Sequence, residues 1–352
     1  MADRRKFIKH LSAAGLVAYL PNLLIPHSVK AKPLPMKGKA DKIWGCLLHL
    51  GTNMWLDYMP ADKPEIGFDP FLRFDEEVWN ESIYKMVEQG LNLVIIDVAD
   101  GVQYESHPEI SVKNAWSPQK LRNELNRLRQ IGIEPIPKLN FSACHDAWMG
   151  VYSRMVSTNK YYEICRDLIS EVCDIFDTPR FFHLGMDEEN PENQRDYNYL
   201  VVRQKDLWWG DLYFLIGEVE KHGSRPWIWA DYVWHNPEEF FKKMPKSVIQ
   251  GNWYYEESFD EKTAKKDWLK ALKAYEDLEK NGYDQIPTGS SFFNHDENML
   301  GTVKYAKKYI ADERLMGFLQ VPWKMTLEKN RDDILKGIEQ LGTAKKWFLY
   351  GR

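Results

Sequence analysis

Short apolar segments alternate with helix-like segments along most of this chain. Eight segments have the length and composition of buried strands, at 43–50, 91–98, 134–139, 181–185, 227–230, 248–253, 288–293 and 317–321. Helical patterns lie between them, at 76–89, 118–130, 161–176, 199–221, 237–244, 264–281, 300–310 and 331–341. Strict alternation indicates a parallel sheet. Eight repeats, with no Gly-x-Gly-x-x-Gly after the first strand, favour a single-domain (β/α)8 TIM barrel over an open doubly wound sheet.

The N-terminus has the pattern of an export signal. Arg4 and Arg5 precede a mostly apolar segment, 11–25, which Pro21 interrupts. The paired arginines resemble a bacterial twin-arginine signal, whose cargo crosses the membrane folded. We therefore predict an export signal at 1–31, a leader at 32–42 and the barrel at 43–345, with a periplasmic or secreted location. The apolar segment is short for a membrane span, so we expect no stable span after cleavage; an uncleaved anchor is the alternative.

Composition narrows the classes of partner. A formal net charge of -5 provides no basic surface for nucleic acid, which we exclude as a partner. The chain holds 14 Trp, 18 Tyr and 16 Phe, which either fill a core or supply stacking surfaces for sugar rings. The four cysteines show no Cys-x-x-Cys spacing, and we predict buried free thiols rather than a zinc or redox site.

In a parallel barrel the functional side chains follow the strands, at one mouth. Polar and aromatic residues are concentrated at these positions, and three tryptophans are less expected of ordinary loops. The candidates for substrate binding are Asp97, Asp100, Asn140, His183, Trp229, Trp253 and Trp323.

The fourth strand ends in two adjacent acids, Asp187 and Glu188. Side-chain alternation breaks down at a turn, so both carboxylates can face one pocket with different burial and different pKa values. Such a pair can provide an acid and an anion, and we predict that these two residues are catalytic. The alternative is a helix N-cap with an acidic first turn.

The segment His183-Leu184-Gly185-Met186-Asp187-Glu188 resembles the His-x-Gly-Gly-Asp-Glu signature of glycoside hydrolase family 20, the β-N-acetylhexosaminidases. Segments 90–100, 131–137 and 226–231 are similar to that family's second, third and fifth strands, in the same order. The resemblance covers about residues 41–326, and only the Asp-Glu strand is sharply specific.

The resemblance implies hydrolysis of N-acetylated amino sugars or related glycans by a substrate-assisted retaining mechanism, in which the 2-acetamido oxygen attacks the anomeric carbon. Glu188 would be the general acid, with a pKa raised by burial. Asp187 would stay ionised against the acetamide, with His183 and Asp100 supporting both through hydrogen bonds. The three tryptophans would enclose the sugar ring. Neither cofactor nor metal is expected.

The chain also departs from the family pattern. Segment 44–49 contains no Arg, and the last strand has Met325 where the family has a Glu that holds sugar hydroxyls. Asp97 replaces a His, Lys138-Leu139-Asn140 replaces Glu-x-Asp, and the family's N-terminal α/β domain is absent from the sequence pattern. A catalytically inactive carbohydrate-binding barrel is therefore an open alternative. A metal-dependent sugar isomerase or hydrolase with His183, Asp187 and Glu188 as ligands is a third, while His145 beside Asp146 is only a weak metal pair.

Overall fold

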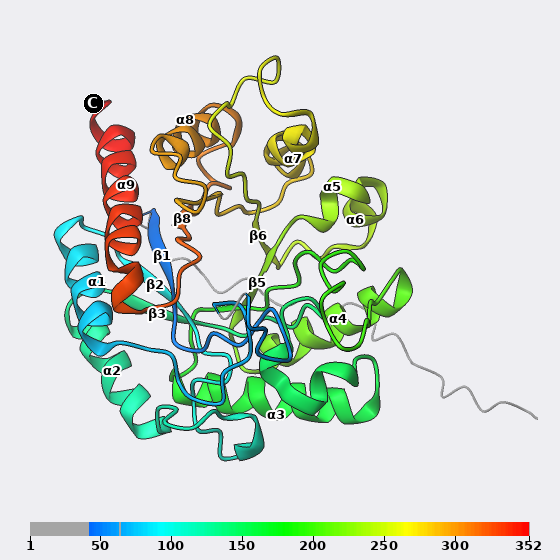
Figure 1. Cartoon of the computed structure of the whole chain (residues 1–352). Helices are drawn as coiled ribbons and strands as arrows, with labels where there is room; N and C mark the ends of the chain where they lie inside the picture. The colour runs from blue at the N-terminus through cyan, green and yellow to red at the C-terminus, as the bar shows by residue number, and fades with distance from the viewer. Residues whose placement is uncertain (1–41, 63–64, 352) are drawn as a thin grey trace, which may run out of the picture. The chain divides into compact units, whose positions relative to one another are not determined.

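The computed structural model describes residues 42–62 and 65–351, and its eight strands form one parallel sheet in the order β6-β5-β4-β3-β2-β1-β8-β7 (Figure 1). The predicted (β/α)8 fold is confirmed. The strands are β1 (Ile43–His49), β2 (Leu93–Asp97), β3 (Glu134–Lys138), β4 (Phe181–His183), β5 (Arg225–Trp229), β6 (Ile249–Gly251), β7 (Thr288–Gly289) and β8 (Gly317–Gln320).

The barrel closes between β6 and β7 by a sparse seam. Whereas β1 and β2 pair over five residues, β6 and β7 are joined by isolated parallel bridges, Gln250 to Gln285 and Trp253 to Thr288. The β7 strand was expected over 288–293, but only its first two residues are in the ladder. Residues 290–293 turn away to the mouth of the barrel instead.

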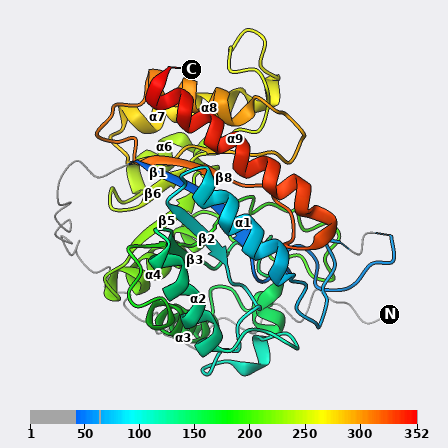
Figure 2. The same cartoon turned by 90° about the vertical axis from the view of Figure 1, so that its left-hand side faces the viewer.

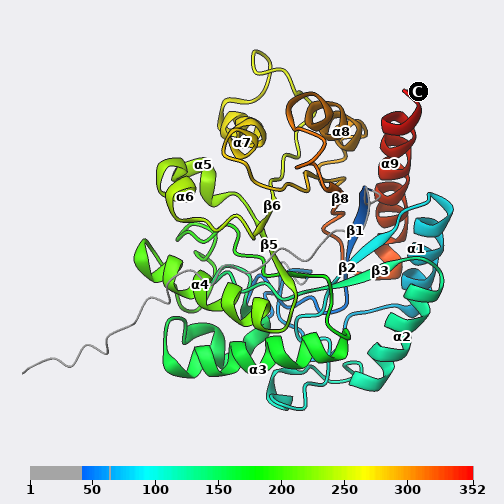
Figure 3. The same cartoon turned by 180° about the vertical axis from the view of Figure 1, so that it is seen from behind.

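Helices surround the strands. Figure 2 shows α9 beside α1, and Figure 3 shows α3 and α4 together on one side of the sheet. The α-helices are α1 (Glu76–Glu88), α2 (Pro118–Gln130), α3 (Asn159–Ile175), α4 (Asp206–Lys221), α5 (Tyr232–His235), α6 (Pro237–Lys243), α7 (Leu269–Lys280), α8 (Asn298–Tyr309) and α9 (Arg331–Tyr350). Short 3-10 helices are η3 (Pro108–Ile110), η4 (Ala147–Arg154), η5 (Lys266–Trp268) and η6 (Glu328–Asn330).

The helix ends follow the capping signals in part. The Ser117 hydroxyl accepts the Lys120 backbone N–H at the start of α2, and Gly90 ends α1 with a φ of 68°. The last helix was expected to end at residue 341 but continues to Tyr350. Gly342 does not end this helix. It is needed for packing, because a Cβ at this position would lie 2.2 Å from the Gln89 side chain. The glycine lets α9 pack closely against the end of α1.

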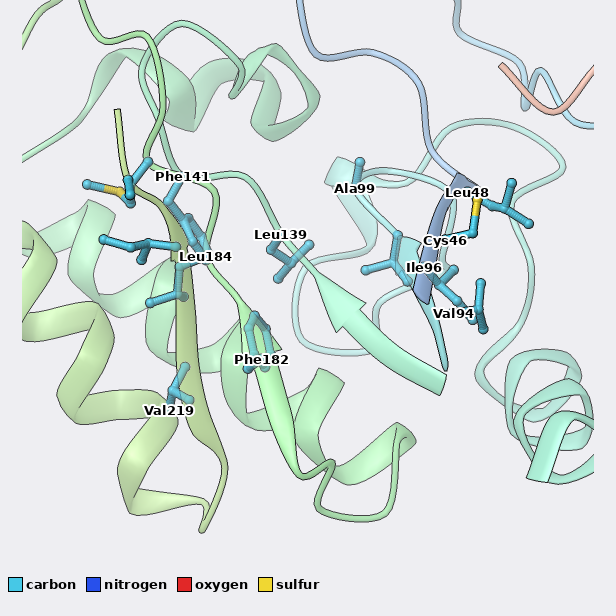
Figure 4. Close-up of a cluster of buried hydrophobic side chains, with 14 of the residues drawn as sticks. Cys46, Leu48, Val94, Ile96, Ala99, Leu139, Phe141, Phe182, Leu184 and Val219 are labelled. Carbon is cyan, nitrogen blue, oxygen red and sulfur yellow. The ribbon is translucent and has the colours of Figure 1, made fainter. Parts of the chain in front are cut away.

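Strand alternation separates two hydrophobic layers. In β1, Cys46 and Leu48 face the helices, while Leu47 faces the barrel interior. Figure 4 shows part of the outer layer, where Phe182 and Leu184 belong to one buried cluster with Leu139 and Phe141. The inner layer carries large aromatic rings toward the C-terminal ends of the strands.

Some expectations concern segments that the structure does not describe. The predicted signal, 1–31, and the leader up to residue 41 lie outside the described residues. Within the described part, no helix combines the length and apolar character that a membrane span requires. The prediction of free thiols is confirmed, since all four cysteines are buried and unbridged.

Candidate active site

A cavity of about 850 Å³ opens at the C-terminal ends of the strands. Its lining contains six of the nine residues that the sequence nominated, from β3, β4, β5, β6 and β8 or the loops that follow them: Asn140, Asp187, Glu188, Trp229, Trp253 and Trp323. The rule that places function at the strand ends therefore locates the acids and the aromatic walls in one cavity.

The chain leaves β4 abruptly, and this turn brings the acids to the cavity. Gly185, Met186 and Glu188 have φ values of 70°, 72° and 55°, a left-handed conformation that is unfavourable for the two residues other than glycine. A Cβ at Gly185 would lie 1.9 Å from the Asn140 side chain, so only glycine fits. The Gly185 N–H donates to His183 Nδ1 at 3.0 Å. The left-handed backbone and the close approach of Asn140 therefore both require glycine at position 185.

The two carboxylates have unlike surroundings. Asp187 is 6% exposed, and its Oδ1 accepts from Asn140 Nδ2 at 2.8 Å. The Glu188 side chain is 39% exposed, and its backbone N–H donates to Asp231 Oδ2 at 2.9 Å. One acid is therefore fixed within the cavity wall and the other faces its open space.

His145 contacts both acids. Its Nε2 lies 3.2 Å from Glu188 Oε2 and 3.5 Å from Asp187 Oδ2. Burial alone would lower the pKa of His145, but the charges of Asp187 and Glu188 raise it to about 9. At neutral pH the ring therefore carries its proton between the two carboxyl groups.

The pKa shifts of the acids run opposite to the sequence-based expectation. Burial raises the pKa of Asp187, although the charge of His145 opposes that rise. Burial also favours a higher pKa for Glu188, but the hydrogen bond and charge of His145 outweigh it and lower that pKa. The expectation did not include His145, whose hydrogen bond and charge lower the pKa of Glu188.

Three nominated residues lie behind the cavity lining. Asp97 is fully buried in an ion pair with Lys138, and Asp100 accepts from Asn53 Nδ2 at 2.6 Å. Burial raises the pKa of Asp100 to about 7. The His183 ring lies 4.3 Å from that of Trp229. Within the described residues, neither His183 nor Asp100 hydrogen-bonds to the acids, in contrast to the support expected of them.

Other cavity residues were missed or not given a role. Tyr254, after the sixth strand, faces the helices, whereas the next residue, Tyr255, lines the cavity, where its hydroxyl accepts from Trp323 Nε1 at 3.0 Å. Trp253 and Tyr255 share a face because side chains alternate along extended backbone. This alternation was the available signal for Tyr255. His145 had only been considered together with Asp146, whose carboxylate is buried away from the pair.

The same cluster has donor atoms that suit a cation. Single ligand atoms of His145, Asp187 and Glu188 all lie within 4.8 Å of one another, and such a set can hold a divalent metal. The metal alternative therefore involves His145 in place of His183, whose ring packs against that of Trp229.

A pH effect on stability follows from the raised pKa of His145. Between its usual value near 6.5 and about 9, the folded protein holds a proton that the unfolded chain releases, so stability falls as the pH rises through that window. His145→Gln removes this proton site. We expect the difference in unfolding free energy between the wild type and His145→Gln to be largest below pH 6.5 and to shrink toward pH 9, which denaturant titrations can measure.

The control is His222→Gln, at the end of α4 and away from the cavity. A difference between wild type and His145→Gln that stays constant across the window would contradict the assignment of a charged His145. The raised pKa values of Asp100 and Asp231, to about 7 and about 8, contribute a fall of the same sign. Asp100 and Asp231 are present in both the wild type and His145→Gln, so the difference in unfolding free energy between these two proteins reports on His145.

The fold and the cavity define a (β/α)8 barrel with two adjacent acids in an aromatic pocket. No family model and no curated protein sequence matches the chain. Solved structures do match. The chitobiase of Flavobacterium johnsoniae gives a TM-score of 0.54 at 14% identity, over 79% of this chain and 51% of the other. The glycoside hydrolase family 20 exo-β-N-acetylglucosaminidase of Vibrio harveyi, in complex with N-acetylglucosamine, gives 0.57 at 14%, over 86% and 54%.

Dispersin B gives a TM-score of 0.53 at 15% identity, over 86% of this chain and 99% of its own length. The chain is thus structurally similar to catalytic domains of family 20 β-N-acetylhexosaminidases. It spans about half the length of the Flavobacterium and Vibrio proteins. At these identities the likeness concerns the fold, and activity has to be argued from the site.

Proposed function

We propose that this protein is a glycoside hydrolase that acts on N-acetylated amino sugars or related glycans by substrate-assisted retaining hydrolysis. The observation that carries the proposal is the placement of Asp187 and Glu188 side by side, with unlike burial, in a cavity walled by Trp229, Trp253 and Trp323. Indole faces suit the C–H faces of a sugar ring, and the two acids suit the acid and the anion of the reaction.

In the proposed reaction, Asp187 accepts the acetamide N–H and the acetamido oxygen attacks the anomeric carbon. The bond to the leaving oxygen breaks as Glu188 delivers a proton to that oxygen. The positive charge that develops on the sugar keeps Asp187 ionised. Asn140, bonded to Asp187 Oδ1, fixes the orientation of the carboxylate.

His145 is the source of the proton that Glu188 delivers to the leaving oxygen. The His145–Glu188 pair shares one mobile proton, which rests on the imidazole while the cavity is open to water. A bound sugar covers Glu188 and disfavours its charged form, so the proton moves to the carboxylate. The lowered pKa of Glu188 comes from the charged His145 beside it, and an acid role is compatible with that pairing.

A thiazoline analogue of the cyclised acetamide tests this proposal. We expect it to inhibit hydrolysis of an aryl N-acetyl-β-glucosaminide competitively, and Asp187→Asn to weaken its binding about 10- to 100-fold, because one charge-assisted hydrogen bond is lost. Calorimetry measures the binding, with Asp196→Asn, on the exposed part of the same loop, as the control. Failure of the analogue to bind the wild type at millimolar concentration would count against the acetamide mechanism.

A carbohydrate-binding barrel without catalysis is the second candidate. It is favoured by the lining of the cavity at the end of β8, where Met325 provides no carboxylate for sugar hydroxyls and Lys324 pairs with Asp333 at 3.3 Å. The acids would then serve only to bind the acetamide. Binding without turnover of any N-acetylated glycoside would support this candidate.

We also retain the proposal that the protein is exported by the twin-arginine route and acts in the periplasm or outside the cell. It is supported by Arg4 and Arg5 ahead of the short apolar segment 11–25. The four unbridged cysteines are compatible with a cargo that folds before it crosses the membrane.

A further inference from the structure

A basic and aromatic surface lies at the end of the barrel opposite the cavity. It is formed by α8 and the last part of α9, which pack side by side (Figure 2). The ring centroid of Phe348 in α9 lies 5.5 Å from that of Trp44 and 5.7 Å from that of Phe318, near the N-terminal ends of β1 and β8. Because the cavity lies at the C-terminal ends of the strands, this α8–α9 surface and the cavity are at opposite ends.

The α8–α9 surface is locally positive. Together, α8 and residues 341–351 hold five lysines and no Asp or Glu. Four of these lysines are exposed, and none of the four forms an ion pair with a described residue: Lys304, Lys307, Lys308 and Lys346. Of the two acids that follow α8, Asp312 pairs with Lys42 at 3.0 Å and the next residue pairs with Arg314 at 3.8 Å. The formal net charge of -5 therefore conceals a basic patch.

Apolar side chains lie among these lysines. The Nζ atoms of Lys304 and Lys307 lie 5.5 Å and 5.3 Å from the centre of the Trp347 ring. Beyond this ring, Leu349 is 53% exposed and Tyr350 is 72% exposed. Lysines beside exposed Leu and Tyr side chains are typical of segments that lie on an anionic membrane, because the charges pair with lipid head groups while the apolar groups enter the boundary with the acyl chains.

The chain enters the barrel at the same end. Lys42, the first described residue, donates from Nζ to the Asp312 carbonyl at 2.6 Å, just after α8. Residues 1–41 precede it in the sequence and include the apolar segment 11–25 of the proposed export signal. Whatever remains of this leader is therefore attached to the barrel beside the α8–α9 surface, and an exported protein presents that surface to the bilayer it has crossed.

We propose that the α8–α9 surface binds peripherally to anionic phospholipid, so that the barrel rests on a membrane with its cavity facing away from the bilayer. The four exposed lysines lie against lipid phosphates, and Leu349 and Tyr350 enter the interface. A glycan then reaches the cavity from the side that the membrane does not cover. Binding of this kind needs neither a membrane-spanning helix nor catalysis, so it is independent of the proposed hydrolysis.

The test measures co-sedimentation of the full chain with vesicles of phosphatidylcholine that contain about one-third phosphatidylglycerol, and with vesicles of phosphatidylcholine alone. The wild type should bind the anionic vesicles far more tightly, and added salt should release it. Replacing all four exposed lysines of the surface by Gln should lower the partition coefficient on anionic vesicles about 100-fold or more, because each lysine near such a membrane contributes about fivefold. The substitutions are Lys304→Gln, Lys307→Gln, Lys308→Gln and Lys346→Gln.

The charge-matched control removes four exposed lysines before and at the start of α7, by Lys262→Gln, Lys265→Gln, Lys266→Gln and Lys270→Gln. It should bind like the wild type. The export signal is the same in all of these proteins, so the differences between them report on the α8–α9 surface. Equal binding by the wild type and the surface variant, or equal losses in the surface variant and the control, would overturn the proposal.

A third variant separates a lipid surface from any other polyanion. Leu349→Ser with Tyr350→Ser keeps every lysine, and we expect it to weaken binding to anionic vesicles about tenfold, because apolar contact with the interface is lost. Unchanged binding by this variant would overturn the assignment to lipid and indicate a charged polysaccharide instead. All the substituted side chains are exposed, so the variants should keep the wild-type fold, which circular dichroism can verify.

Discussion

Glu188→Gln should strongly reduce turnover while leaving glycan binding intact. The amide keeps the size and polarity of the side chain but cannot deliver a proton to the leaving oxygen, so kcat is expected to fall by about 10²- to 10⁴-fold. The variant also removes one anion beside His145, whose Nε2 lies 3.2 Å away, and the ring then pairs with Asp187 alone. Steady-state kinetics on an aryl N-acetyl-β-glucosaminide measure the loss, and calorimetry with the thiazoline analogue measures binding.

The matched control for this variant is Glu192→Gln, an exposed acid in the same loop. It should retain wild-type kcat and KM. Full activity of Glu188→Gln would remove Glu188 from the role of acid. Loss of binding together with activity would instead indicate that Glu188 mainly positions the ligand.

Arg203→Met should cause the largest loss of stability. The Arg203 side chain is 1% exposed and pairs with Glu189 at 2.6 Å and with Asp211 at 3.0 Å. It also donates to the Phe141 carbonyl at 2.6 Å, and so ties the loop after β3 to the loop after β4. Methionine fills a similar volume but leaves two buried carboxylates without a cation. Breaking such a network costs about 3–5 kcal/mol, which we expect to lower Tm by roughly 5–10 °C.

Arg195→Met is the control, because Arg195 is 77% exposed and lies 4.0 Å from Asp196 at the surface. Its Tm should stay close to that of the wild type, since exposed pairs contribute little. An unchanged Tm in Arg203→Met, measured by thermal unfolding, would contradict the structural role of the buried cluster. The acids lie on the loop that Arg203 holds, so kcat should fall as well.

Periodicity and strand-end position were enough to predict the fold and much of the cavity. Each of the eight apolar segments overlaps one of the eight strands, because buried parallel strands must be nearly continuous in apolar residues. Trp229, Trp253 and Trp323 were located because the carboxyl end of each strand faces the same mouth. These inferences need only local sequence and the geometry of a barrel.

What could not be predicted depends on loop conformation. The contact of His145 with both acids requires the left-handed turn at Gly185 and Met186, and no local pattern specifies how that loop meets the one after β3. Without His145, the direction of the pKa shift of Glu188 could not be derived. Residues 290–293 have the composition of a strand, but Phe292 and Phe293 leave the ladder for the cavity rim. Local preference and structure disagree at the rim of the cavity.

The loops after β4 and β7 carry separate parts of the mouth of the barrel. Asp187 and Glu188 follow β4, within the ladder from β1 to β6, while Phe292 and Phe293 follow a two-residue strand that only bridges join to β6. Insertions or substitutions after β7 would disturb few ladder hydrogen bonds. Changes after β7 would therefore reshape one rim of the barrel and leave Asp187 and Glu188 in place.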